Sequence, residues 1–231
     1  MNYRKKAAQL NTATGIVRRF AGVLLALALI FVASTIYDML AFTGAGLSGG
    51  FPGFEALLKE NPDTVAWIRM DGTHIDHPVV QGKDNFTYVN KGFDGKYYQG
   101  GAIFLDAGNN KDFSDEYIII HGHHMDRGAM FSDVASYTEK DFFDDNKTGD
   151  LITPDAMYQL YVVGVKMADA YEGELYYVAP DVKKPLHLME DCLYKRDVEF
   201  DEDDKLVLLS TCAGDMTTSR VVVFCRARKM S

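Results

Sequence analysis

The chain has 231 residues, of which 47% are hydrophobic and 12% aromatic, enough for one domain with a sizeable core and a separate extra segment. It contains 24 lysines and arginines against 33 aspartates and glutamates, so its net charge is −9. Five basic residues and no acidic ones precede residue 20, which leaves residues 20–231 with 19 basic residues and a net charge of −14. This acidic balance argues against nucleic acid as a partner, because binding phosphates needs the opposite sign.

The extra segment is N-terminal. Residues 20–37 (FAGVLLALALIFVASTIY) carry no charge, and as a helix they would span about 27 Å, close to the ~30 Å hydrocarbon core of a bilayer. The basic residues that precede them favour a cytoplasmic N-terminus. We therefore predict a cytoplasmic tail over 1–19, a single transmembrane anchor over 20–37, a linker with a short helix over 38–60, and an extracellular domain over 61–231. A cleaved signal peptide and a buried core helix are the alternatives, although the run is longer than a typical signal-peptide core and no A-x-A site follows it.

The remainder of the chain predicts a mostly β domain. Apolar, β-branched runs separated by turn signals indicate about eight strands, and an Asp-Gly pair at 71–72 is typical of a hairpin between the first two. Short helices are expected at 54–60, 84–90, 126–137 and 184–195. With turns at this spacing, the pattern favours a mostly antiparallel, barrel-like sheet. The predicted strands cover residues 64–70, 73–81, 102–106, 116–121, 150–153, 157–166, 206–210 and 221–225.

A stretch near the C-terminus, KLVLLSTCAGDMTTSRVVVFCRAR over 205–228, draws attention to a cysteine and an arginine. Cys212 ends one predicted strand and Arg220 begins the next, so both would face the same edge of a sheet. This arrangement would hold a nucleophile beside a fixed positive charge. A buried structural cysteine with a solvated arginine is the alternative. Cys192 and Cys225 lie among apolar residues and are expected to serve packing, and a disulfide between them stays open.

A second stretch, YIIIHGHHM over 117–125, runs from a buried-strand pattern directly into histidines. A thiol has an unperturbed pKa of about 8.5, so it needs a partner to become a thiolate at neutral pH. A histidine close in space is the usual partner.

Together these stretches resemble the sortases of Gram-positive bacteria. The resemblance rests on GHHM and on LSTC followed by RVVV, and the text between them is similar to class B sortases in particular: AWIRMDGTHIDHPVVQGKDNFTYVN, GGAIFLD and HGHHMDRGAMF. It covers residues 61–228. It implies an eight-stranded sortase-type β-barrel with a helix between the sixth and seventh strands, which falls on the segment 184–195.

The resemblance also implies the site and the reaction. Cys212 matches the nucleophile, His123 the catalytic histidine and Arg220 the arginine that stabilises the oxyanion. The enzyme would cleave a sorting signal after Thr through a thioacyl intermediate and transfer the protein to an amine of the cell wall. Its partners would be surface proteins with an Asn-Pro-x-Thr-like or Ser/Pro-x-Thr-Gly-like signal, a peptidoglycan amine and the membrane, with no cofactor or metal. Positions that match the peptide groove are Asn85, Val89, Ser210 and Thr211.

A degenerate sortase that only binds its substrate is one alternative, although the presence of Cys212, His123 and Arg220 argues against it. Three other functions stay open on the sequence alone. A pilin-polymerising sortase is one, although the lid motif Asp-Pro-(Trp/Phe) that often accompanies that role does not occur in residues 41–61. A cysteine peptidase that uses water as the acceptor is another. The third is a metal site, because His121 and His123 would share one strand face and His124 follows them.

Overall fold

In the computed structural model of the protein, residues 53–125, 128–179, 182–212 and 218–230 are described. The predicted tail (1–19), the predicted anchor (20–37) and most of the predicted linker lie outside these residues. Within the described ranges, we find no helix of the length and apolar character that crossing a membrane requires.

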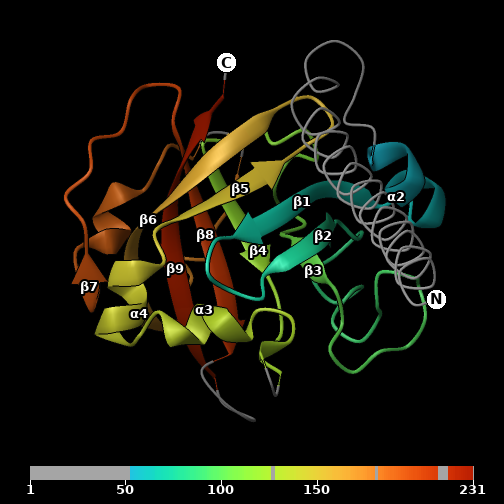
Figure 1. Ribbon diagram of the computed structural model, residues 1–231, viewed down its shortest axis with the longest axis horizontal. Coiled ribbons are helices and arrows are strands. Elements are labelled where there is room, and N and C mark those ends of the chain that lie inside the picture. The colour runs from blue at the N-terminus through green and yellow to red at the C-terminus, as the bar shows by residue number, and fades with distance from the viewer. Residues whose placement is uncertain (1–52, 126–127, 180–181, 213–217, 231) are drawn as a thin grey trace, which may run out of the picture. The chain divides into compact units, whose positions relative to one another are not determined.

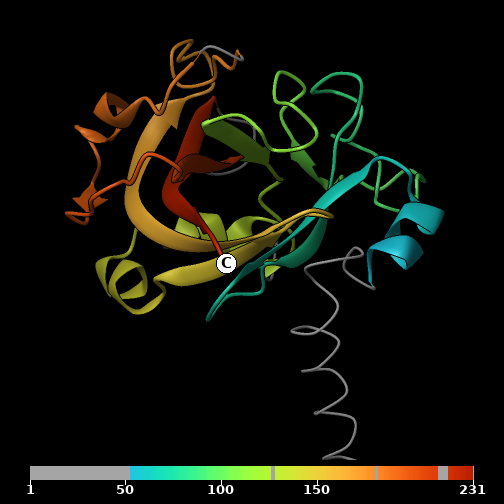
Figure 2. The ribbon, with the colours of Figure 1, turned by 90° about the horizontal axis from the view of Figure 1, so that it is seen from above.

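The described residues form one nine-stranded sheet in the order β5-β1-β2-β3-β4-β8-β9-β6-β7 (Figure 1). Because β5 pairs with β6 as well as with β1, eight of these strands close into a barrel, and β7 is attached to β6 outside the ring. The long β6 bends around one side of that barrel (Figure 2). The eight-stranded barrel predicted from the sequence is therefore confirmed. The strands are β1 (Thr64–Met70), β2 (Asp76–Val80), β3 (Ile103–Leu105), β4 (Tyr117–His121), β5 (Thr148–Ile152), β6 (Met157–Asp169), β7 (Tyr194–Lys195), β8 (Lys205–Cys212) and β9 (Ser219–Lys229).

The wall formed by β4, β8 and β9 is buried on both faces. Residues such as Ile118 and Leu209 pack inside the barrel, whereas Ile119 and Leu208, one position along, pack in a separate cluster outside it. The connection between β6 and β8 covers that outer face with Leu175, Leu188 and Met189. Burial on two sides explains why these strands are continuous apolar runs instead of alternating apolar and polar residues.

The helices are short and lie outside the barrel. They are α2 (Phe54–Glu60), α3 (Ser132–Ser136), α4 (Lys140–Asp145) and the 3-10 turn η2 (Leu186–Met189). The helix predicted at 84–90 is wrong, since this segment consists of turns. The carboxylate of Asp84 accepts hydrogen bonds from Phe86 N at 3.1 Å and Thr87 Oγ1 at 2.8 Å, which stabilises a local turn of the kind that competes with a helix.

The helix predicted over 184–195 is reduced to the four residues of η2. Pro185 precedes η2 and has no N–H to donate, and after η2 the chain bonds to β6 instead of continuing as a helix. Leu193 N donates to Val165 O at 2.7 Å, and β7 then pairs with β6. As a result Met189 is buried, whereas Leu193, which the helical spacing placed on the same apolar face, is 52% exposed.

The different burial of these two residues makes the correction testable. We expect Met189→Ala to lower the free energy of unfolding by about 2–3 kcal/mol, because it removes a buried side chain and leaves a cavity. Leu193→Ala should change it by less than about 0.5 kcal/mol, as is usual at an exposed site. Equilibrium urea unfolding of the full chain measures both. Similar losses in the two variants would instead support an amphipathic helix over 184–195.

Candidate active site

The register of β8 with its two neighbours brings the three predicted catalytic residues to one edge of the barrel. β8 runs parallel to β4, with Ser210 opposite His121, and Gly122 N extends the ladder by donating to Ser210 O at 3.1 Å. Two residues beyond this pair, β8 ends at Cys212, and the chain that continues from β4 reaches His123. β9 runs antiparallel to β8, and there Cys212 lies opposite Arg220.

Gly122 lets the chain pass close to the core just before His123. A Cβ atom at this position would lie 2.5 Å from Ile103 Cδ1 and 2.7 Å from Phe131 Cγ, closer than packed atoms approach. The backbone of His123 is also fixed, since Phe131 N donates to His123 O at 3.0 Å. Because Gly122 has no side chain, the backbone can pass this close to Ile103 and Phe131, and this path fixes the position of His123.

A main-chain carbonyl fixes the imidazole of His123. Its Nε2 lies 2.7 Å from Val89 O, and because a carbonyl can only accept, Nε2 carries the proton. Nδ1 is then the nitrogen that can accept a proton. Val89 was predicted as a groove residue; the structure places its carbonyl on His123 and packs its side chain against the buried cluster that contains Val80 and Phe104.

The three cysteines, all of which lie in the described residues, are free thiols. Burial raises the pKa of Cys192 to about 11 and that of Cys225 to about 12, so both stay protonated and unreactive at neutral pH. Cys212 is partly exposed at the end of β8, where it lies opposite Arg220. Chemistry and position thus leave Cys212 as the candidate nucleophile, and the packing role predicted for the other two agrees with where they lie.

Carboxylate charge is present beside Arg220. In the ladder of β6 with β9, Arg220 lies opposite Ala168, and Asp169 is the next residue. Hydrogen bonds from Tyr171 N and from Thr218 Oγ1 (2.9 Å), together with the charge of Arg220, lower the pKa of Asp169. The carboxylate of Asp169 is therefore ionised, and it lies close to the backbone of Arg220.

A polar network that the sequence analysis missed lies beside the end of β8 that carries Cys212. His121 Nε2 lies 2.8 Å from Asp106 Oδ2, and Asn85 Nδ2 donates to the same oxygen at 2.7 Å. Asn85 Oδ1 in turn accepts from Ala107 N at 2.7 Å, so the amide of this predicted groove residue is held at both ends. A signal was present in the sequence: Asp106 and His121 are the last residues of two consecutive predicted strands.

The network continues to the residues beside Cys212. Tyr176 belongs to the connection after β6. Its hydroxyl oxygen lies 2.9 Å from Ser210 Oγ, and its ring stacks on that of His121 with 6.0 Å between the centroids. Burial raises the pKa of Tyr176, so the hydroxyl keeps its proton. Ser210 and Thr211 are only 3% and 2% exposed, so their side chains are almost fully covered, and the groove contact predicted for them stays a prediction.

The histidines of this segment have different environments. His121 pairs with Asp106, His123 with a carbonyl, and His124 bridges to Met130 through the backbone. Among the described residues, no three His, Cys, Asp or Glu side chains are arranged to hold a metal ion.

Comparison with known proteins identifies the fold and the family of this chain. No family model matches the chain. Sortase B of Staphylococcus aureus is 30% identical over 189 residues, which are 78% of this chain and 76% of that protein. Sortase B of Listeria monocytogenes is 29% identical over 178 residues, 72% of this chain and 70% of that protein. The crystal structure of Clostridium perfringens sortase B matches with a TM-score of 0.69 at 31% identity, covering 76% of this chain and 99% of that one.

These similarities define the class of the protein first: it is an enzyme with the sortase fold, a cysteine transpeptidase. Within that class, the chain belongs to the class B sortase family. The resemblance read from the sequence motifs is thereby confirmed.

The polar network gives a prediction for pH. Burial alone would raise the pKa of Asp106, but hydrogen bonds from His121, Gly108 N and Asn85 outweigh it and leave that pKa below its ordinary value. A carboxyl with a lowered pKa stabilises the fold above its unfolded pKa of about 3.9, and this stabilisation is lost as the pH falls through the folded pKa. We expect Asp106→Asn to lower the free energy of unfolding most near neutral pH, and the difference from wild type to shrink below about pH 4.

Denaturant unfolding at several pH values measures this difference. The exposed Asp197, changed to Asn, is the control and should show little effect at any pH. A deficit in Asp106→Asn that is the same at pH 7 and pH 3 would contradict an ionised Asp106.

Proposed function

We propose that this chain is a membrane-anchored transpeptidase that cleaves a sorting signal after Thr and joins the released protein to an amine of the cell wall. One observation carries the proposal. The ladders of β8 align Cys212 with Arg220 on one side and bring it to the same strand ends as His123 on the other.

In the first step, the Cys212 thiolate attacks the Thr carbonyl and forms a tetrahedral intermediate. His123, protonated on Nδ1 while Nε2 stays bonded to Val89 O, gives that proton to the leaving amine. The C–N bond breaks, and a thioester joins the protein to Cys212. The leaving chain departs with its new amino terminus.

In the second step, an amine attacks the thioester and His123 Nδ1 accepts its proton. The C–S bond breaks, the sulfur leaves as the thiolate, and an amide forms. Arg220 donates hydrogen bonds to the oxyanion of both tetrahedral intermediates. Its planar fork suits this task better than the point charge of a lysine.

The proposed donor substrate is a surface protein with an Asn-Pro-x-Thr-like or Ser/Pro-x-Thr-Gly-like signal. A structural neighbour supports a peptide substrate: the Staphylococcus aureus sortase B–substrate complex matches with a TM-score of 0.72 at 29% identity, over 84% of this chain and 92% of that one. The fixed amide of Asn85 and the partly exposed Val89 would meet the peptide. The uncharged residues 20–37 would anchor the enzyme, with the catalytic domain outside the cell.

A second candidate has one observation in its favour. A class B sortase of Streptococcus pyogenes involved in pilus biogenesis also matches, with a TM-score of 0.70 at 30% identity. Pilin polymerisation would use the same nucleophile with a lysine of a second pilin as the acceptor. The two functions differ only in the acceptor, so the chemistry above holds for both.

A peptide library tests the proposed function. We expect the full chain to cleave peptides of the two signal types after Thr, and to yield an amide product when an amine is added. Cys212→Ala should abolish cleavage, because it removes the atom that forms the thioester. Cys192→Ala is the matched control and should retain it. Cleavage by the Cys212→Ala variant, or hydrolysis that added amine never diverts, would rule out the transpeptidase proposed here.

The arginine has its own prediction. Arg220→Lys should lower kcat/KM for peptide cleavage by a factor of about 10²–10³, as the loss of an oxyanion donor typically does. Steady-state cleavage rates of the folded variant measure this. An unchanged kcat/KM would remove Arg220 from the mechanism.

A further inference from the structure

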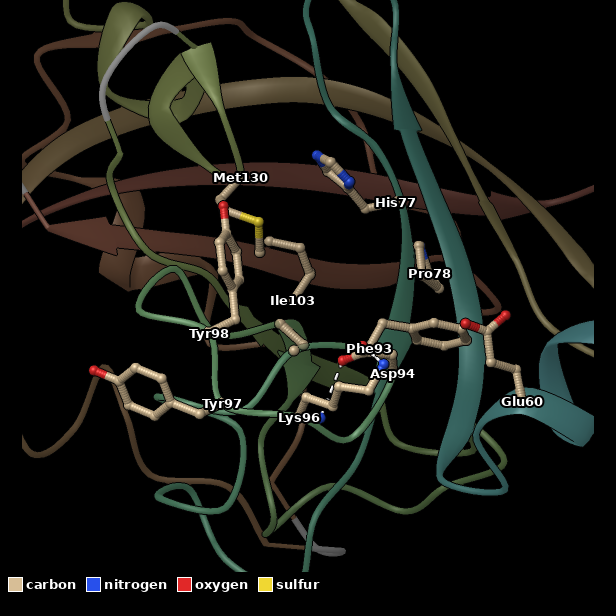
Figure 3. A pocket seen from close by; sticks show the side chains of 13 residues that line it. Glu60, His77, Pro78, Phe93, Asp94, Lys96, Tyr97, Tyr98, Ile103 and Met130 are labelled. Carbon is tan, nitrogen blue, oxygen red and sulfur yellow. Dashed lines mark hydrogen bonds and ion pairs between the residues drawn. The ribbon is translucent and has the colours of Figure 1, made fainter.

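A cavity of about 500 Å³ lies beside β2 and β3 (Figure 3). Its walls come from β2, from β3 and from the segment between them, and α2 contributes its last residue. Cys212, His123 and Arg220 do not line it. Its principal side chains are Glu60, His77, Phe93, Tyr98, Ile103 and Met130.

The inner wall of this cavity adjoins the segment that holds His123. Gly101, in that wall, has its Cβ position 2.6 Å from Val89 O, the oxygen that His123 Nε2 contacts. Met130 bridges to His124 on the same segment. In Figure 3 the ring of Tyr98 stands beside Met130, and Ile103 lies next to them. The cavity is therefore next to the histidine and separated from it by a single layer of backbone.

The chemistry of the cavity suits a positive charge on an apolar stem. Asp94 is paired with Lys96 at 3.1 Å, whereas Glu60 forms no ion pair within the described part of the chain. Burial lowers the pKa of His77, which keeps that ring neutral at pH 7. Glu60 is thus the uncompensated charge, and the rings of Phe93 and Tyr98 add faces on which a cation can stack.

We propose that this cavity binds the acyl acceptor, specifically a peptide that carries a second cationic group beyond the amine that reacts. The inference rests on the proposed function. The amine that leaves and the amine that enters both exchange a proton with His123, so the acceptor chain reaches the thioester from the histidine's side. Because the backbone at Val89 and Gly101 separates the cavity from the ring of His123, the cavity is placed to hold the part of the acceptor that follows the amine, and Glu60 selects a cation there.

The thioester can react with an amine acceptor or with water, and the ratio of these two products tests the proposed acceptor site separately from peptide cleavage. The full chain is given the sorting peptide that it cleaves fastest, together with Gly-Gly-Arg-amide or Gly-Gly-Gln-amide as the acceptor. Arginine adds a charge without adding a nucleophile. The ratio of amide product to hydrolysis product reports on the acceptor alone, since both products arise from one thioester.

We expect wild type to favour the arginine acceptor over the glutamine acceptor by about three- to tenfold, from one exposed charge pair and one cation–π contact. Glu60→Gln should remove most of this preference, and Glu60→Lys should reverse it. Glu55→Gln, an exposed glutamate on the same helix, is the matched control and should retain it. Tyr98→Leu should weaken the preference without changing the rate of peptide cleavage.

Hydroxylamine, which is small and neutral at pH 7, serves as an acceptor that does not need the cavity. Its partitioning should be equal in wild type and in every variant. Equal use of the two peptides by wild type would overturn the inference, as would a preference that survives Glu60→Gln. Loss of hydroxylamine transfer in that variant would overturn it too, because the defect would then lie in the chemistry. Failure of wild type to cleave any sorting peptide is a different result, which removes the proposed function and the acceptor site with it.

Discussion

The pairing of β8 with one parallel and one antiparallel neighbour is the constraint on which the site depends. Parallel pairing with β4 makes the two strands end together, and antiparallel pairing with β9 returns the chain to the same edge. A shift of one residue in either ladder would turn Cys212 to the opposite face of the wall. Packing on both faces of this wall resists such a shift, because inward and outward side chains are both fully buried.

Near Cys212, several polar side chains pair with one another. Asp106 accepts from His121 and Asn85, and Tyr176 meets Ser210 while stacking on His121. Such a network joins the loop after β2, the ends of β3 and β4, and the connection after β6. It thereby holds these segments in fixed positions relative to β8. A site that is already in position loses less entropy when a peptide binds.

The two sides of His123 differ in character. Toward Asn85 lies the hydrogen-bonded network, suited to a peptide backbone with specific polar groups. Beyond the carbonyl of Val89 lies the cavity with aromatic walls and one uncompensated carboxylate. In the proposed mechanism, the sorting signal and the acceptor would use these two unlike surfaces, with His123 between them.

The sequence alone determined the strands of the barrel and the three catalytic candidates. Continuous β-branched runs marked the doubly buried wall, and Cys212, His123 and Arg220 each stood at the end of such a run. It also carried a strong motif resemblance to class B sortases, which the comparisons confirm. These signals are local, because strand periodicity and strand ends are properties of neighbouring residues.

Only the tertiary structure decided what depends on contacts between distant segments. The segment 184–195 has helical spacing, yet bonds to β6 keep it from forming more than the turn η2. Asp106, Tyr176 and the carbonyl of Val89 became part of the site through partners 15 to 34 residues away. Periodicity describes one segment at a time, whereas a hydrogen bond between two segments exists only once the barrel has closed and brought them together.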